Sequence, residues 1–394
     1  MPRERKPIIL TCVAAFWPGN EASGPNLSVE AMISALRDDF DFYRLALDRP
    51  RGGDTSLASD ESWRDDGLGG RLRYCAPGVI AAARRLSILR ETPHDLLLLN
   101  SFHDPEFSIP ALAARKLGLL PRKPAILSPR GEFSRAALSI KPARKTAYRL
   151  AARGAGLFDD IWLHATSEAE RDDIKRALPV EKGLFFATNI RRLPEPVAHR
   201  SAEGGRLRVK FLARVSRLKN LDLALEALAL CSANIDFEIY GPLEDAEHWA
   251  ACEARIATLP ERICVRYCGV LANDAVRDMF AGADLLFLPS RSESFGHSIF
   301  EALACGVPVL IGDATPWKNL QADCGGWDLP IDPRRFAGAL DLYAGMDANA
   351  RAAWRAGARQ RAERWVKDND SVAMTRSMLL AAMTEGETCA ASPA

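Results

Sequence analysis

Short apolar segments alternate with segments of helical period along almost the whole chain of 394 residues, and this alternation limits the folds available to it. Each apolar segment has the length of a strand that is buried on both faces. The sequence predicts strands at residues 7–13, 41–47, 72–75, 96–99, 125–128, 161–165, 207–213, 236–240, 263–268, 284–288 and 307–311. It predicts helices at residues 28–39, 168–177, 221–231, 274–281, 348–365 and 371–384. This order indicates an α/β fold with parallel sheets covered by helices on both faces.

The length of the chain exceeds that of one ordinary hydrophobic core, so two domains are expected. A polar stretch rich in Pro and Gly, residues 193–205, has no period and suits an interdomain connection. The predicted domains are residues 1–195 and 206–365, joined by a linker of residues 196–205. A further helix is predicted within residues 366–387, followed by a small, polar tail at 388–394 that is expected to be disordered. Residues 48–70 are predicted to form a polar surface loop.

The overall composition is that of a soluble globular protein, with 48% hydrophobic and 26% charged residues. A net charge of +1 gives no general attraction to nucleic acid or to membranes. The nine cysteines are scattered and include no CxxC pair, which favours free thiols in the cytoplasm. Basic residues before the apolar stretch 8–16 resemble a signal peptide, but no clear cleavage site follows, so a first core strand is the preferred interpretation. No apolar run is long enough to span a membrane.

Two glutamates, Glu293 and Glu301, stand eight residues apart in a strand–turn–helix pattern. An apolar run at 283–288 precedes a polar turn containing Gly296, and a helical pattern follows at 299–304. This order places polar side chains at the carboxyl end of a strand and directs the amides of a helix N-terminus at an anion. The alternative is an ordinary helix with a solvated carboxylate at each end.

The whole string from residue 283 to 309, which ends in Gly306-Val307-Pro308-Val309, closely resembles retaining glycosyltransferases of family four, also called group 1. The segments 100–101, 129–132 and 315–317 are similar to the bacterial members that make exopolysaccharide and lipopolysaccharide. The resemblance implies the GT-B fold, in which two Rossmann-like domains with parallel sheets face an interdomain cleft. It also implies that the last helix crosses back to the first domain.

The resemblance assigns the donor site to the second domain. Arg214 and Lys219, which follow the strand at 207–213, would clamp a diphosphate with a guanidinium fork and an ammonium point charge. Arg217 could take the place of either one. Glu293 would bind hexose hydroxyls, and Glu301 would hold the ribose. The further donor-binding candidates are Gly24, Val270, Phe295, Gly296 and His297.

The first domain would bind the acceptor. His103 follows the strand at 96–99, where many family members place a catalytic histidine, and ligands bind beyond the carboxyl ends of such strands. Asn20, Arg130 and Glu132 are candidate acceptor residues. Arg130 and Glu132 could also form a structural ion pair. The glycine loop that the family places near the leaving diphosphate keeps Gly24, but proline follows it where a second glycine is common.

The implied reaction moves a hexose from a nucleoside-diphosphate sugar to a saccharide or lipid-linked acceptor in cell-surface polysaccharide synthesis. The leaving oxygen can take the proton of the acceptor, so no protein nucleophile is required. No metal and no cofactor are expected, because the Asp-x-Asp sequences at 39–41 and 368–370 do not follow predicted strands. Two alternatives remain open: a nucleotide-sugar epimerase of the same fold, and a nucleotide-sugar-binding protein without activity.

The basic segment at residues 135–153 contains no acidic residue. Such a segment can lie against anionic lipid head groups, or it can be a solvated helix face. The free thiols favour a cytoplasmic protein, and the basic segment allows peripheral contact at the inner face of the membrane.

Overall fold

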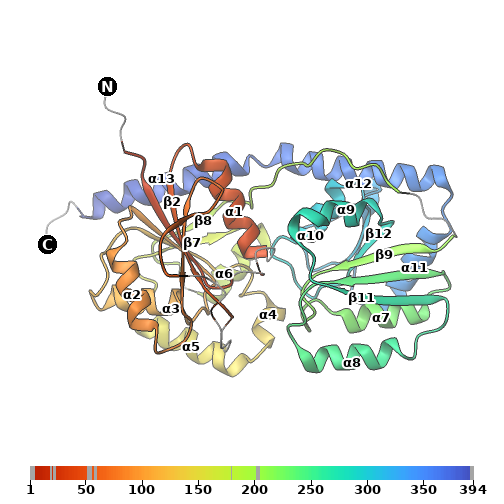
Figure 1. The fold of residues 1–394 in the computed structure, drawn as a ribbon, viewed down its shortest axis with the longest axis horizontal. Coiled ribbons are helices and arrows are strands. Elements are labelled where there is room, and N and C mark those ends of the chain that lie inside the picture. Colours follow the sequence, from red (N-terminus) through yellow and green to blue (C-terminus); the bar gives the residue numbers. More distant parts are fainter. Residues whose placement is uncertain are drawn as a thin grey trace. The chain divides into compact units, whose positions relative to one another are not determined.

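The computed structural model of this chain describes residues 5–17, 20, 24–50, 56, 60–178, 180–200 and 205–390, with side chains as far as residue 384. The chain folds into two compact units (Figure 1). The first contains residues up to Arg191 together with residues from Asp370 onward, and the second runs from Arg192 to Asn369. The first unit is therefore built from two separate stretches of sequence.

In the described part of the first unit, eight strands form one sheet in the order β3-β4-β2-β1-β5-β6-β7-β8. The strands are Ile8–Val13 (β1), Asp41–Leu47 (β2), Arg64–Asp65 (β3), Arg71–Cys75 (β4), Leu96–Asn100 (β5), Ala125–Ser128 (β6), Trp162–Ala165 (β7) and Leu184–Phe186 (β8). Neighbouring strands are parallel, except for β3 and β4. The helices are Gly24–Leu36 (α1), Ala82–Glu91 (α2), Ser108–Lys116 (α3), Arg135–Ser139 (α4), Pro142–Gly154 (α5), Glu168–Ala177 (α6) and Ser371–Ala390 (α13).

Helices cover both faces of this sheet because its central strands are apolar on both sides. In β1, Leu10 and Cys12 belong to a core shared with α2 and α3, whereas Ile9 and Val13 belong to a core shared with α1. Successive residues of a strand point to opposite faces, so β1 needs a continuous apolar run rather than an alternating one.

Helix α13 packs on the first unit, although it follows the second unit in the sequence (Figure 1). Leu379 and Ala382 are fully buried in the core that also contains residues of α1. The hydroxyls of Thr188 and Ser371 lie 2.7 Å apart, and Arg376 Nη2 donates to Asp39 Oδ2 at 2.8 Å. Both apolar and polar contacts thus attach the C-terminal helix to the first unit.

The described residues of the second unit form a six-stranded parallel sheet in the order β11-β10-β9-β12-β13-β14. The strands are Leu207–Leu212 (β9), Ile235–Tyr240 (β10), Ile263–Gly269 (β11), Leu285–Leu288 (β12), Val309–Gly312 (β13) and Gly326–Leu329 (β14). The helices are Leu221–Leu230 (α7), Ala246–Ile256 (α8), Val276–Ala281 (α9), His297–Ala304 (α10), Pro333–Ala344 (α11) and Ala348–Asp368 (α12), and short 3-10 helices occupy Asn273–Ala275 and Leu320–Asp323. The central strands β9 and β12 lie side by side, so the loops that follow them meet at one edge of the sheet.

Every strand that the sequence predicts is present, with ends that shift by no more than two residues. The predicted loop at 48–70 is wrong in part, because it contains β3, which is too short to show any period. The sequence also gave no sign of β8, a half-buried strand, or of β14. Strand β14 begins at Gly326, where a Cβ atom would lie 2.0 Å from the carbonyl oxygen of Val309. That close approach requires a glycine, and glycine weakens the strand pattern.

The stretch predicted as a linker is partly fixed to the second unit. Arg277 donates to the carbonyl oxygen of Pro196 at 3.3 Å, and the amide of Arg200 donates to the carbonyl oxygen of Ala281 at 2.9 Å. Residues 201–204 of the predicted linker lie outside the described residues, as do residues 391–394 of the predicted tail. Helix α13 continues to Ala390, past the predicted start of that tail.

Candidate active site

The connection between β12 and α10 forms the centre of the candidate site. Gly296 precedes α10 with φ +81°, and a Cβ atom there would lie 2.6 Å from Ile299 Cδ1, so the turn favours glycine. Trp317 Nε1 donates to the carbonyl oxygen of Phe295 at 2.6 Å, and the Phe295 ring packs 5.2 Å from that of Trp365. Contacts with Trp317 and Trp365 therefore fix the turn, and Gly296, at the N-cap position of α10, provides no capping side chain.

Lys219 and Glu293 meet at this edge of the sheet. Lys219 Nζ lies 2.5 Å from Glu293 Oε1, and Ser290 Oγ donates to the same oxygen at 2.8 Å. The two charged side chains are only 13% and 9% exposed. The structure thus brings together a cation that precedes α7 and a carboxylate that follows β12. Sequence reasoning missed Ser290, because a serine in a polar turn has no distinguishing pattern.

Asn220 holds the two loops that carry this pair. It is fully buried and has φ +63°, a backbone conformation that asparagine tolerates better than most residues. Its Nδ2 donates to the carbonyl oxygen of Pro289 at 3.1 Å, and its Oδ1 accepts from Arg291 Nε at 3.0 Å. The loop after β9 and the loop after β12 are therefore linked directly, which fixes the positions of Lys219 and Glu293.

Arg214 and Arg217 bind acidic residues of the β10–α8 region instead of Glu293. Arg214 Nη1 lies 2.6 and 2.7 Å from the two carboxylate oxygens of Glu244, and both side chains are about half exposed. Arg217 donates to Asp245 at 3.1 Å and to Glu247 at 2.7 Å. Exposed ion pairs of this kind contribute about 0–1 kcal/mol, so an anionic ligand could displace Glu244 from Arg214 at small cost.

The other donor candidates lie around the same helix or after β11. His297 and Glu301 are one helical turn apart in α10, which puts them on one face of the helix. The Phe295 side chain is buried in the core, so only its backbone is available to a ligand. Val270, after β11, is 58% exposed.

In the first unit, His103 and Glu132 form a hydrogen-bonded pair beyond the ends of β5 and β6. His103 Nδ1 lies 2.8 Å from Glu132 Oε2, which also accepts from the backbone amides of Phe102 and His103. The Ser101 hydroxyl binds Glu132 Oε1. Of the two interpretations left open for Glu132, the ion pair with Arg130 is not formed among the described residues, and Glu132 pairs instead with the candidate catalytic histidine.

Arg130 binds two asparagines. Its Nη2 donates to Asn100 Oδ1 at 2.9 Å and its Nη1 to Asn189 Oδ1 at 3.1 Å. Residues 130 and 131 have φ +57° and +80°, so the backbone turns sharply just before Glu132. Burial lowers the pKa of Arg130 to about 10, so the guanidinium stays cationic at neutral pH. Both ring nitrogens of His164 form hydrogen bonds, one with the hydroxyl of Ser128 and one with the carbonyl oxygen of Ala187, which suits a structural role.

The loop that contains Asn20 and Gly24 is described only in part, since residues 18, 19 and 21–23 lie outside the described residues. Asn20 Nδ2 donates to the carbonyl oxygen of Ala15 at 2.6 Å, and Asn26 Nδ2 donates to the carbonyl oxygen of Asn20 at 2.6 Å. Gly24 is the first residue of α1. The Asn20 amide thus supports its own loop in this structure.

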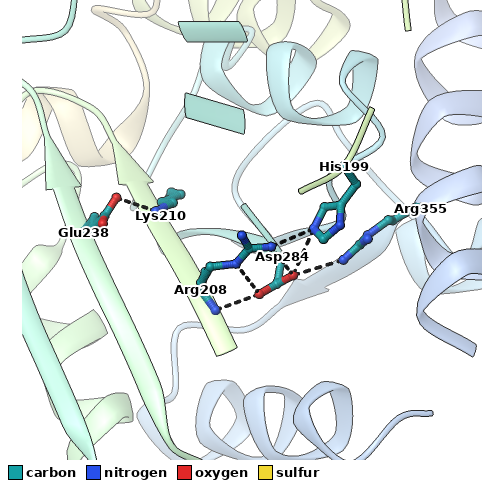
Figure 2. A network of polar contacts seen from close by, with 6 residues as sticks. All are labelled: His199, Arg208, Lys210, Glu238, Asp284 and Arg355. Carbon is teal, nitrogen blue, oxygen red and sulfur yellow. Dashed lines mark hydrogen bonds and ion pairs between the residues drawn. The ribbon is translucent and has the colours of Figure 1, made fainter. Parts of the chain in front are cut away.

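A separate polar network lies at the opposite ends of the strands in the second unit (Figure 2). Asp284, just before β12, binds Arg208 at 3.1 Å, Arg355 at 3.0 Å and His199 at 3.1 Å. Burial raises the pKa of Asp284, but hydrogen bonds from His199 and Arg208 outweigh burial and lower that pKa below its usual range. Because ligands of parallel sheets bind at the carboxyl ends of strands, this network at the amino ends is assigned to stability.

Lys210 and Glu238 pair across β9 and β10 in the same unit (Figure 2). Burial raises the pKa of Glu238, but hydrogen bonds from Lys210, Tyr240 and Arg266 lower it to about 2. Glu238 is therefore an ionised acceptor for three neighbours. Across the described residues, no three His, Cys, Asp or Glu side chains gather as a metal site would require.

Comparison with known proteins finds similarity to sugar-transferring enzymes, mainly in the second unit. Residues 198–324 match the family described as glycosyl transferases group 1. The chain is 30% identical over 175 residues to D-inositol 3-phosphate glycosyltransferase of Jonesia denitrificans, covering 42% of this chain and 41% of the relative. It is 28% identical over 204 residues to a GDP-mannose-dependent alpha-(1-6)-phosphatidylinositol dimannoside mannosyltransferase of Mycobacterium tuberculosis, covering 49% and 51%. The chain thus spans about half the length of these curated relatives, or less.

Among solved structures, sucrose-phosphate synthase of Thermosynechococcus elongatus matches with a TM-score of 0.76 and 15% identity, over 98% of this chain and 100% of that one. A likeness at this identity establishes the fold alone. The match extends over both units of this chain. The fold is GT-B, which confirms the fold predicted from the sequence.

Proposed function

We propose that the protein, whose residues 198–324 match the family of group 1 glycosyl transferases, moves a hexose from a nucleoside-diphosphate sugar to a saccharide or lipid-linked acceptor, with retention of anomeric configuration. The observation that carries the proposal is the contact between Lys219 and Glu293 beside the start of α10. A cation, a carboxylate that can accept hydrogen bonds and the N-terminal amides of a helix together suit a ligand that is a sugar at one end and a diphosphate at the other.

The proposed reaction forms one bond and breaks one bond at the anomeric carbon. The acceptor hydroxyl attacks that carbon from the face that the diphosphate leaves, the bond to the phosphate oxygen breaks, and this oxygen takes the hydroxyl proton. Lys219, Arg214 and the amides at the start of α10 stabilise the charge that grows on the diphosphate. Glu293 orients the hexose through its hydroxyls, and Glu301 binds the ribose. No added metal is needed for these steps.

The names of the relatives support both substrates. One relative is named as GDP-mannose-dependent, which is a nucleoside-diphosphate sugar, and its named acceptor is a phosphatidylinositol dimannoside, which is a lipid-linked saccharide. A role in making a cell-surface polysaccharide is consistent with an acceptor of this kind, and it forms part of the proposal.

We expect the protein to be stabilised by a nucleotide-sugar and to turn it over in the presence of EDTA. A thermal-shift screen of UDP-glucose, GDP-mannose and other nucleotide-sugars will identify the donor, because a ligand that binds only the folded state raises the apparent stability, by about 2.7 kcal/mol at 100 times Kd. Product analysis then decides the reaction. Free nucleoside diphosphate with a glycoside of unchanged anomeric configuration supports the proposal.

Other products would contradict it. An isomeric nucleotide-sugar would indicate an epimerase, and binding without turnover across a broad set of saccharide and lipid acceptors would indicate a binding protein. An inverted product would overturn the retaining mechanism, and dependence on added divalent metal would overturn metal independence.

We also propose that α4 and α5 lie against anionic lipid. Arg135, Lys141, Arg144 and Arg153 are exposed, and no ion pair involves them in the described part of the chain. Leu150, on the same helix, is 63% exposed. Exposed basic residues beside an exposed leucine suit a membrane surface. No helix among the described residues is long and apolar enough to cross a membrane.

Reversing two of these charges, in Lys141→Glu/Arg144→Glu, is expected to lower affinity for vesicles that contain phosphatidylglycerol by at least about tenfold. Each basic residue near an anionic surface contributes about 1 kcal/mol. Co-sedimentation measures the effect, and Arg90→Glu/Lys175→Glu is the matched control, since it makes the same charge change on exposed residues of α2 and α6. Equal loss in the two double variants, or equal binding to phosphatidylcholine vesicles, would contradict a specific lipid-facing surface.

A further inference from the structure

The Glu132 carboxylate is almost fully occupied by the segment that carries His103. Its Oε2 accepts from His103 Nδ1 at 2.8 Å, from the His103 amide at 2.9 Å and from the Phe102 amide at 3.0 Å. Its Oε1 binds the hydroxyl of Ser101. A carboxylate has about four acceptor positions. Four donors from three consecutive residues therefore leave Glu132 little capacity to bind an acceptor sugar itself.

These contacts determine which ring nitrogen of His103 carries the hydrogen. An ionised carboxylate can only accept, so the nitrogen that faces it, Nδ1, must be the donor. In the neutral ring, Nε2 then has a free lone pair. His103 Nε2 is buried and has no hydrogen-bond partner within the described residues. A buried acceptor without a partner is costly, and such an atom in a native protein calls for an explanation.

Aromatic side chains prevent the ring from turning to another orientation. The His103 ring lies 4.8 Å from that of Phe102 and 5.8 Å from that of Tyr148, both in edge-to-face geometry. Phe133 packs at 6.2 Å. Three aromatic neighbours and one carboxylate thus hold both the orientation and the tautomer of the ring.

We propose that Glu132 is a positioning residue that holds His103 in the Nδ1–H tautomer, so that Nε2 accepts a hydrogen bond from a hydroxyl group of the substrate. The identity of that hydroxyl as one of a sugar substrate rests on the proposed function. In this role Glu132 acts through His103 and does not touch the acceptor, which differs from the role that the sequence suggested for it.

The test compares Glu132→Ala with Glu132→Gln by NMR of protein labelled with ¹⁵N-histidine and by steady-state kinetics. The chain has only six histidines, and His103→Gln assigns the signal. Glu132→Ala removes the acceptor, so the Nε2–H form is expected to appear and kcat to fall about 100-fold, with KM for the donor within about twofold. Glu132→Gln keeps an oxygen acceptor for Nδ1, so it is expected to keep the tautomer and to retain kcat within about tenfold.

The double variant His103→Ala/Glu132→Ala is expected to be no slower than His103→Ala alone, because residues that act as one unit are not additive. Glu91→Gln, an exposed carboxylate at the end of α2, is the matched control and is expected to leave kcat unchanged. Thermal unfolding of each variant reports loss of fold separately.

The proposal is overturned if His103 carries its hydrogen on Nε2 in the unmodified protein, or if Glu132→Ala changes neither the tautomer nor kcat. Equal losses of kcat in the Ala and Gln variants, with a raised KM for the acceptor, would indicate that Glu132 binds the acceptor directly. If the unmodified protein turns over no nucleotide-sugar, the proposed function fails, while the NMR comparison still decides whether Glu132 sets the His103 tautomer.

Discussion

Replacing Lys219 by alanine is expected to lower kcat/KM for the nucleotide-sugar by about 100- to 1000-fold, the loss that follows removal of one preorganised donor to developing charge. Lys219 Nζ lies 2.5 Å from Glu293 in a site where both side chains are largely buried. Electrostatic interactions are stronger in such surroundings than in water. Without Lys219, the leaving diphosphate loses a cation. Glu293 also loses one of the two partners of its Oε1 and keeps the other, the hydroxyl of Ser290.

Arg217→Ala is the matched control for Lys219→Ala, because Arg217 lies two residues away in the same loop. Its side chain is 57% exposed and paired with Asp245 and Glu247, so its loss is expected to change kcat/KM by no more than about twofold. Steady-state kinetics with the donor found in the thermal-shift screen measures both variants. Full activity in Lys219→Ala, or equal losses in the two variants, would contradict the assignment of the diphosphate site to Lys219.

Replacing Asp284 by asparagine is expected to destabilise the second unit by about 3 kcal/mol, the lower part of the range for breaking a buried ion pair. The Asp284 side chain is 4% exposed and is the common acceptor for Arg208, Arg355 and His199 (Figure 2). Asparagine keeps the volume but removes the charge that these groups share. The side chains of these three partners are 18–23% exposed and remain partly solvated, which limits the loss.

Denaturant unfolding measures this loss, and Asp236→Asn is the matched control. Asp236, on β10, pairs with Arg206. Because the Asp236 side chain is 42% exposed, its replacement is expected to change the free energy of unfolding by no more than about 1 kcal/mol. Similar losses of unfolding free energy in the two variants would mean that burial of the Asp284 network does not strengthen its contribution to stability.

The same network predicts how acid acts on stability. Burial raises the pKa of Asp284, but the hydrogen bonds it accepts from His199 and Arg208 lower it below the unfolded value, which is near 3.9 for an ordinary aspartate. A depressed folded pKa stabilises the folded state above the unfolded pKa, and this stabilisation is lost as the pH falls toward the folded pKa. The unfolding midpoint should therefore drop more steeply below about pH 4 in the unmodified protein than in Asp284→Asn. Parallel pH curves would contradict this account.

The sequence predicted the parallel sheets well because buried strands require apolar runs that local pattern alone reveals. Strands β2 and β6 begin and end at the predicted residues, and β14 was missed because its first residue, Gly326, is dictated by contact with Val309 on a neighbouring strand. Local patterns carry no information about such contacts between distant segments.

In the candidate site, too, some features could be predicted from the sequence and others could not. The proximity of Lys219 and Glu293 could be predicted because both follow neighbouring parallel strands. The partner of Arg214 could not, since Glu244 comes from another loop, and the pairing of Glu132 with His103 was not foreseen. Two consecutive positive φ angles, at Arg130 and Gly131, turn the backbone just before Glu132, and arginine is a residue type that does not indicate such a conformation.

The discontinuous first unit has a consequence for synthesis on the ribosome. Once residue 369 has been made, every residue of the second unit exists, whereas the first unit still lacks Met378, Leu379 and Ala382 of its core. Domains generally fold as units and in the order in which they emerge. In this protein the first unit begins to be synthesised first but can complete its fold only last. Until α13 emerges from the ribosome, the nascent chain exposes an apolar surface that chaperones can bind.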